Sequence, residues 1–267
     1  MPRPLSGLVA ALTLLGTACG SPRSWSALSE AVARNDAAIV KTMLEAGPAS
    51  PADSPHELMM WAARHDAGDV IALLASRGVD VNERDAGRNR WTPLQHAVHT
   101  HQKTAVRVLL DWGADPNAVD EQGRLTPLLM AAGDPDPAIV QLLLASGANP
   151  RYVGEHGDTP LTRAVSGGAL SDIDAPIFGG CRTATVRALL SADPDLHLPQ
   201  SRVGRLAIWW ARFHDCEEVL SLVRTWTSHT AADKIVTAGG VVKDALGVPT
   251  PKDVLRGTPA RDAPSPR

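Results

Sequence analysis

Apolar residues recur along this chain with the spacing of amphipathic helices, in four segments of equal length. The segments begin at residues 28, 59, 94 and 128 and share one order of residues. An apolar residue is followed by an alanine three positions later, an aliphatic residue nine positions after that, and a glycine seven positions further. Apolar positions at i, i+3 and i+4 line one face of a helix, and a glycine after a helix supplies a left-handed C-cap. Each segment therefore predicts two consecutive helices and a turn.

The alanine of this pattern continues beyond the fourth segment, which predicts six units. The six alanines are Ala31, Ala62, Ala97, Ala131, Ala164 and Ala211. Their separations are 31, 35, 34, 33 and 47 residues, so the last one holds a repeat and an insertion of about 13 residues. This insertion, at about residues 168–181, interrupts the fifth unit, and the sixth unit lacks the closing glycine, as an end cap would. A helix pair cannot bury its own apolar face, so we expect the units to stack.

Two short motifs accompany the repeat. Thr-Pro-Leu stands at 92–94, 126–128 and 159–161, where the threonine can cap a helix and the proline can occupy its first turn. GVDVN (78–82), GADPN (113–117) and GANP (147–150) follow the predicted second helices. Together these features resemble the ankyrin repeat over roughly residues 25–225. The resemblance implies an all-α fold, an ankyrin-repeat solenoid of about six helix-turn-helix units with short hairpin-like tips.

The chain also departs from that repeat. The histidine that usually follows Thr-Pro-Leu in the family, and ties adjacent loops, is replaced by Gln95, Leu129 and Thr162. The first two units lack Thr-Pro-Leu altogether. The tip at residues 82–91 is two residues longer than the family's turn and carries three arginines. Loops on a repeat array often carry the individual function of a protein, although surface loops also tolerate insertions.

The N-terminus is typical of an export signal. Arg3 precedes the apolar stretch LSGLVAALTLLG, which is too short to span a bilayer comfortably. The following LLGTACGS resembles the lipobox of bacterial lipoproteins, which implies lipidation of Cys19, although Gly16 stands where that family usually has leucine. Ordinary signal-peptidase cleavage nearby is the alternative, and it would give a soluble periplasmic or secreted protein. We expect residues 1–18 to be the signal peptide, 19–24 a tether, 25–227 the repeat domain and 228–267 a mostly flexible extension.

Composition and motifs narrow the class of function. The net charge of −3 is not the basic balance of a nucleic-acid-binding protein. G-x-S-x-G, P-loop and H-E-x-x-H motifs are missing from the sequence, so we predict that the protein is not an enzyme and uses no cofactor. The resemblance instead implies a concave face that binds a protein partner, through the tips and the exposed sides of the first helices.

The partner-binding positions implied by this register include residue types that are enriched in interface hot spots. Trp91 and Trp112 are notable because neither occupies an apolar slot of the repeat, but packing against a neighbouring tip or helix would also explain them. Trp61, Trp209 and Trp210 lie beside the repeated alanines and are expected in the core or the cap. The predicted binding residues are Arg64, His65, Arg90, Trp91, His99, Thr100, Trp112, Glu121, Gln122, Arg124 and Tyr152.

Histidines and cysteines raise two further questions. His96, His99 and His101 lie close together in sequence, but the register puts them on a helix and in a turn with no acidic or cysteine ligand, so we predict no metal site. Cys181 and Cys216 fall near the start of the second helices of adjacent units. Stacked helices lie about 8–10 Å apart, too far for a disulfide, unless the insertion closes the gap. In an exported protein a bridge between them is possible, and two free or buried thiols are the alternative.

These observations favour a monomeric, non-enzymatic binding protein at the bacterial envelope. Its partner would be a protein, either a periplasmic enzyme or a toxin that this chain neutralises, and the chain would be membrane-anchored if Cys19 is acylated. A metal-dependent enzyme or sensor that uses the 168–181 insertion and the histidines is the alternative from a different class. A structural role in a secretion assembly is a third interpretation.

Overall fold

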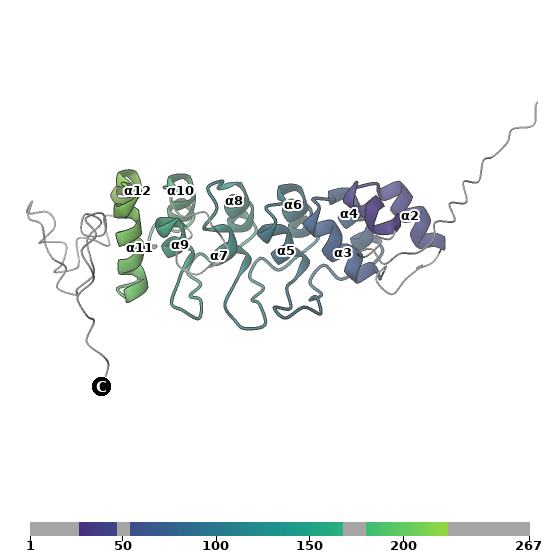
Figure 1. The fold of residues 1–267 in the computed structure, drawn as a ribbon, viewed down its shortest axis with the longest axis horizontal. Coiled ribbons are helices and arrows are strands. Elements are labelled where there is room, and N and C mark those ends of the chain that lie inside the picture. Colours follow the sequence, from purple (N-terminus) through teal and green to yellow (C-terminus); the bar gives the residue numbers. More distant parts are fainter. Residues whose placement is uncertain (1–26, 47–53, 168–179, 224–267) are drawn as a thin grey trace, which may run out of the picture.

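The computed structural model describes residues 27–46, 54–167 and 180–223, and these residues form an elongated row of helix pairs (Figure 1). The signal peptide, Cys19, the tether, nearly all of the insertion and the C-terminal extension lie outside the described residues. Within the described part of the chain every regular element is a helix and none is a strand. None of these helices has the length and apolar character needed to cross a membrane.

The helices form six pairs, one for each unit of the sequence pattern. The first helices of the pairs are α1 (Ala27–Ala33), α3 (Pro55–Arg64), α5 (Pro93–His99), α7 (Pro127–Ala131), α9 (Pro160–Ser166) and α11 (Arg202–Phe213). The second helices are α2 (Ala37–Ala46), α4 (Gly68–Ser76), α6 (Lys103–Asp111), α8 (Ala138–Ala145), α10 (Thr183–Ala192) and α12 (Glu217–Leu222). First helices pack against first helices and second helices against second helices, in two rows (Figure 1). The all-α stack of about six helix-turn-helix units is confirmed.

The core runs along the whole row between the two layers of helices. Each of the six repeated alanines is buried, and the aliphatic residues Val40, Ile71, Val106, Val140 and Val186 of the second helices are buried beside them. A methyl side chain lets neighbouring helices approach closely, and the larger aliphatic side chains fill the space between rows. Stability therefore depends on contacts between neighbouring units more than on any single pair.

The helix starts follow the local chemistry of Thr-Pro-Leu. The hydroxyls of Thr92, Thr126 and Thr159 each accept a hydrogen bond from the backbone N–H three residues later. In α5 and α9 the third helical residue, Gln95 or Thr162, also accepts from the cap N–H and completes a capping box. The proline at the first helical position loses no hydrogen bond there.

The turn inside five of the six described pairs contains a left-handed residue, and the turn between α7 and α8 does not. Asn35, Asp66, His101 and Asp215 have φ between 53° and 58° at this turn, and Gly167 has φ 67° in the fifth unit. Asparagine, aspartate and histidine are the non-glycine residues that adopt this conformation most readily. The turn residues also join neighbouring units, because Asp66 Oδ1 accepts from Ala105 N at 2.7 Å. His101 thus has a backbone role in its turn.

Side-chain amides join each unit to the next at the opposite end of the helices. Asn82 donates to Gly113 O at 3.1 Å and accepts from Asp115 N at 2.8 Å. Asn117 repeats both bonds one unit further on, with Gly147 O and Asn149 N. The GADPN-type turns are therefore hydrogen-bonded to one another along the row.

The two cysteines of the last units form a disulfide, with their Cα atoms 5.3 Å apart. The expected helix spacing of 8–10 Å does not apply to them, because neither cysteine lies inside a helix. Cys181 lies two positions before Thr183, the first residue of α10, and Cys216 is the N-cap of α12. The bond therefore joins two turns and holds the sixth unit to the fifth.

A substitution of Gln95 tests how much stability the buried hydrogen bonds between neighbouring units contribute. Its side-chain amide is buried and donates to Ala118 O at 3.3 Å and Leu125 O at 3.0 Å, across to the next unit. We expect Gln95→Leu to lower the free energy of unfolding by about 1–3 kcal/mol, because it leaves buried backbone carbonyls without donors. Urea unfolding of the full chain measures this. The matched control Gln141→Leu, at an exposed position of α8, should change it by less than about 0.5 kcal/mol.

Candidate functional site

The candidate site is built on the tips that project between second and first helices. Three of them are defined here as the first tip (82–91), the second tip (118–125) and the third tip (151–158), and together they are called the tip row. The tips extend beyond the helices on the side of the first helices (Figure 1). They are separated along the row by one repeat each, so neighbouring tips lie side by side.

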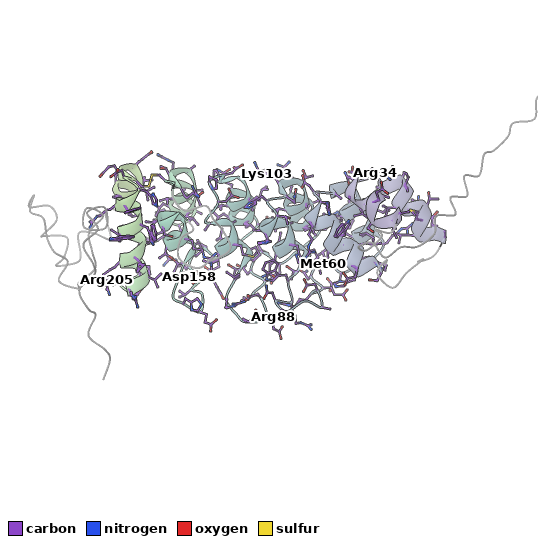
Figure 2. The ribbon with its side chains drawn as sticks, viewed as in Figure 1. Arg34, Met60, Arg88, Lys103, Asp158 and Arg205 are labelled. Carbon is purple, nitrogen blue, oxygen red and sulfur yellow. A yellow bond between two sulfur atoms is a disulfide. The ribbon has the colours of Figure 1, made fainter. Side chains whose placement is uncertain are left out.

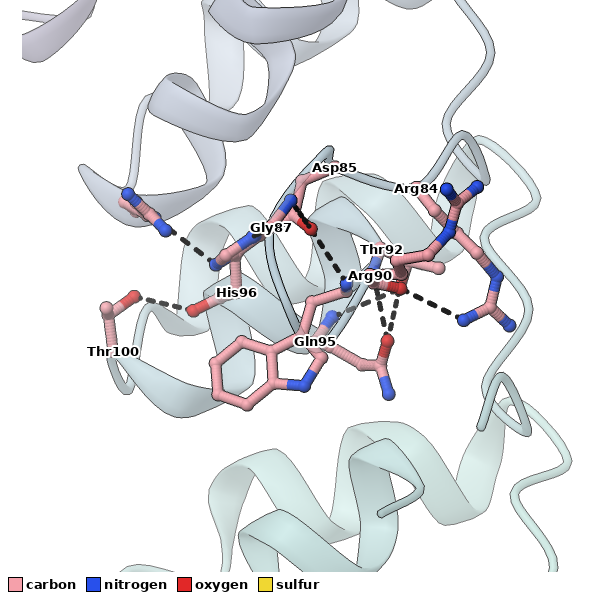
Figure 3. A network of polar contacts seen from close by, with 10 residues as sticks. Arg84, Asp85, Gly87, Arg90, Thr92, Gln95, His96 and Thr100 are labelled. Carbon is pink, nitrogen blue, oxygen red and sulfur yellow. Dashed lines mark hydrogen bonds and ion pairs between the residues drawn. The ribbon is translucent and has the colours of Figure 1, made fainter. Parts of the chain in front are cut away.

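Asp85 folds the first tip. Its Oδ1 accepts hydrogen bonds from Gly87 N at 3.0 Å and Trp91 N at 3.1 Å, and its own N–H donates to Trp91 O at 2.9 Å (Figure 3). Arg90 has φ 46°, a left-handed conformation that lets the chain turn back before Trp91. The two extra residues of this tip therefore form an ordered loop that closes on one carboxylate.

His96 anchors this loop to the helices below it. Its Nε2 lies 2.6 Å from Asp85 Oδ2, and its Nδ1 accepts from Arg64 Nε at 3.2 Å (Figure 3). The partners assign the neutral tautomer with the proton on Nε2. Burial, and then the positive charge of Arg64, lower the pKa of His96, while Asp85 opposes this. The neutral His96 ring thus connects α3, α5 and the first tip through hydrogen bonds. Its contact with Asp85 is a hydrogen bond between a neutral ring and a carboxylate.

The ring of Trp91 packs against His96 and the neighbouring His99. Its ring centroid lies 5.4 Å from that of His96 and 5.0 Å from that of His99, both at inclined angles. The side chain is half-buried, and its Nε1 is buried with no hydrogen-bond partner within the described residues. His99 is exposed beside it, and the Thr100 hydroxyl donates to His96 O at 2.9 Å. One aromatic side chain thus forms the junction between the first tip and the exposed side of α5.

The tips are bonded to one another. Glu121 N donates to Asn89 O at 3.0 Å, and Gln122 Nε2 donates to Arg88 O at 3.1 Å. The guanidinium of Arg90 lies 3.4 Å from the Glu121 carboxylate. Further along, Tyr152 Oη donates to Gly123 O at 2.8 Å, and burial together with the nearby carboxylates raises the pKa of this phenol. The tip row is therefore one continuous polar surface.

The structure places most of the residues suggested by the sequence on this surface, in two groups. Arg64, Trp91, His99 and Thr100 lie around α5, next to the first tip. The second group lies on the tips. Its members Arg90, Glu121, Gln122 and Tyr152 join neighbouring tips, and Arg124 donates to Gln122 within the second tip.

Two suggested residues stand apart from these groups. His65 is the C-cap of α3 and lies against Trp61, with ring centroids 4.4 Å apart. Trp112 is the C-cap of α6, in the row of second helices, and its side chain is 45% exposed. Trp91 precedes a first helix and Trp112 ends a second helix, so the two suggested tryptophans belong to different surfaces. Trp61 itself is partly buried and donates from Nε1 to Ser29 O at 3.1 Å, which joins the first two units.

The repeat register puts His96 on a helix surface and assigns no role to Asp85, whereas the structure buries His96 against Asp85. His96 is buried because Asp85 and Arg64 supply partners for both ring nitrogens, so the ring loses no hydrogen bonds when it leaves water. The signal for Asp85 was present: an aspartate two residues before a glycine in a long tip is a frequent loop closure.

The three neighbouring histidines have separate environments. His96 contacts Asp85, His99 lies against Trp91, and Nδ1 of His101 contacts the Asp134 carboxylate of the next unit. Across residues 27–46, 54–167 and 180–223 no three histidine, cysteine or acidic side chains are grouped closely enough to hold a metal ion. The insertion that the alternative function would use lies almost entirely outside the described residues.

Comparison with known proteins identifies the repeat. A family model described as ankyrin repeats, in three copies, matches residues 28–120, and a second one, described as an ankyrin repeat, matches residues 124–155. Among curated proteins, the ankyrin repeat protein nuc-2 of Neurospora crassa is 32% identical over 99 residues. That alignment covers 36% of this chain and 9% of the relative. The predicted ankyrin repeats are confirmed, and the described helix pairs continue beyond the matched residues to α12.

The lowered pKa of His96 makes a prediction about pH. Its folded-state pKa lies below the ordinary value of 6.5, so the unfolded chain takes up a proton first as the pH falls. Its contribution to stability is therefore complete above pH 6.5 and is lost as the pH falls through the folded-state pKa. We expect His96→Gln, whose amide can accept from Arg64 and donate to Asp85, to lose less free energy of unfolding than wild type between pH 7 and pH 5. Titration of a single group can change the free energy of unfolding by at most about 1.4 kcal/mol per pH unit.

Urea unfolding of both chains at the two pH values measures the difference. The matched control is His65→Gln, because the pKa of His65 is also lowered, first by burial and then by Arg64, at a more exposed position. This control should change the pH dependence less than His96→Gln does. Equal pH dependence in the wild type and in His96→Gln would show that His96 is not the group that titrates.

Proposed function

Because this chain carries ankyrin repeats over residues 28–120 and 124–155, we propose that it is a non-enzymatic, monomeric binding protein of the bacterial envelope that holds a partner protein on its tip row. Ankyrin-repeat proteins are generally interaction modules without catalytic activity. The partner is a periplasmic enzyme, or a toxin that the chain neutralises by binding.

The observation that carries the binding proposal is the continuity of the tip row. Hydrogen bonds fix the first tip to the second and the second to the third, so the surface is ordered before a partner arrives. A surface that is ordered in advance loses less conformational entropy on binding. It also presents Trp91, Tyr152 and several arginines, which are the residue types that contribute most to interfaces.

Two independent features support export. The N-terminal sequence has the organisation of a signal peptide that ends at a lipobox-like site before Cys19. The disulfide between Cys181 and Cys216 agrees with an oxidising compartment, because disulfides persist outside the cytosol and are rare within it. We therefore propose that the chain is carried to the periplasm and anchored there by lipid on Cys19.

Acylation of Cys19 can be tested directly. In a Gram-negative host fed an alkyne-labelled fatty acid, the full chain should incorporate the label and sediment with the membranes. Cys19→Ser should abolish both, because serine lacks the thiol that would carry the lipid. Cys181→Ser is the control and should keep the label. An unlabelled wild type in the soluble periplasm would point to ordinary signal-peptide cleavage.

Partner capture tests the binding surface. Purified wild-type protein on beads should retain a specific protein from an envelope extract of the source bacterium. Trp91→Ala should reduce the retained amount at least about tenfold, because aromatic hot spots commonly contribute 2 kcal/mol or more. His99→Ala, at an exposed position beside Trp91, should reduce it as well and should leave folding intact.

Trp112→Ala is the matched control for capture, since it truncates the same residue type on the row of second helices. It should leave capture close to the wild-type level. Loss of the partner with Trp112→Ala, together with full retention with Trp91→Ala and His99→Ala, would show that the partner binds on the row of second helices.

A further inference from the structure

The first tip differs from the other tips in its exposed charge. It contains Arg84, Arg88 and Arg90 and two acidic residues, Glu83 and Asp85. The side chain of Asp85 is turned inward, 19% exposed, and its oxygens are occupied by two backbone N–H groups and His96. Glu83 lies 3.1 Å from His56, at the start of α3. Asp85 is therefore turned into the protein and Glu83 is paired with His56 at the surface, while Arg88 and Arg90 are exposed and Arg84 is partly exposed.

The three arginines are weakly engaged by the rest of the described chain. Arg84 donates one hydrogen bond, from Nη1 to the carbonyl of Arg90 at 3.0 Å. Arg90 faces Glu121 at 3.4 Å, and both side chains are about half exposed, so water screens this pair. Arg88 is exposed, and no ion pair or side-chain hydrogen bond joins it to another described residue. It lies at the outer edge of the tip row, beyond the helices (Figure 2).

The backbone that carries these arginines is held in place. Asp85 closes the loop from within, and the carbonyls of Arg88 and Asn89 accept hydrogen bonds from Gln122 and Glu121 of the second tip. The guanidinium groups are thus displayed from a fixed loop. Guanidinium groups pair with carboxylates through two parallel hydrogen bonds, which favours a carboxylate ligand over a neutral one.

We propose that the first tip binds an acidic, extended segment of the partner protein, with carboxylates paired to Arg84, Arg88 and Arg90. This inference rests on the proposed function and specifies the chemistry of its partner. Trp91, at the base of the same tip, adds an apolar contact next to the arginines. A nucleic acid is the less favoured ligand, because the chain as a whole carries a net charge of −3 and the arginines are confined to one tip.

The test uses full-length protein and a fluorescein-labelled peptide of alternating glutamate and glycine, followed by fluorescence anisotropy. The wild type should bind this peptide, and binding should weaken as salt is raised. Arg88→Glu should weaken it about fivefold to tenfold, because it replaces an attraction by a repulsion at an exposed site. Arg107→Glu makes the same charge change at an exposed position of α6, away from the tips, and should leave binding within about twofold.

Two comparison ligands complete the test. The peptide with glutamine in place of glutamate should not bind measurably, and a single-stranded oligonucleotide should bind less tightly than the glutamate peptide. The proposal is overturned if wild type does not bind the glutamate peptide, if Arg88→Glu and Arg107→Glu weaken binding equally, or if the oligonucleotide binds more tightly through the same arginines. If Arg88→Glu still captures the natural partner at the wild-type level, the proposal that the partner binds through an acidic segment is wrong, while the proposed binding function stands.

Discussion

No helix pair in this chain can cover its own apolar side, and the rest of the structure follows from that constraint. The repeated alanines let neighbouring pairs approach closely, and the aliphatic residues of the second helices fill the layer between the rows. Each helix pair is therefore stabilised by packing against its neighbours. The last pair is additionally held by the Cys181–Cys216 disulfide. The stacking also brings successive tips side by side, which turns separate loops into one surface.

Polar side chains make that surface ordered. Asn82, Asn117 and Gln95 form hydrogen bonds with backbone groups one unit away, so the turns and tips share the spacing of the helices. Gln95 occupies the position where the family usually has histidine, and its amide supplies a tie between loops of the kind expected of that residue. At the equivalent positions of the next two units, Leu129 is simply buried and Thr162 bonds within its own cap. The first and second tips are also hydrogen-bonded to each other, and they carry five of the eleven candidate binding residues: Arg90, Trp91, Glu121, Gln122 and Arg124.

The candidate site was predictable in part. Its arginines, Trp91 and the second tip follow from the register of the repeat, because a position just before Thr-Pro-Leu must lie on a tip. The roles of His96 and Asp85 did not follow, since they depend on a loop that folds back over α5 and on an arginine from the previous unit. The separation of Trp91 from Trp112 on two different surfaces did not follow from the register either. Both flank one unit in sequence, yet one precedes a first helix and the other ends a second helix, so they lie in different rows.

The sequence by itself determined the number of units, the helix starts at Thr-Pro-Leu and the glycine-ended turns, because capping and apolar periodicity act within a few residues of one another. The tertiary structure decided which side chains meet across units. It put Cys181 and Cys216 at adjacent turns, turned Asp85 of the first tip toward His96, paired Glu83 with His56 and left Arg88 exposed. Such pairings depend on the exact stacking of neighbouring units and on how a loop closes, and no spacing along the chain specifies either.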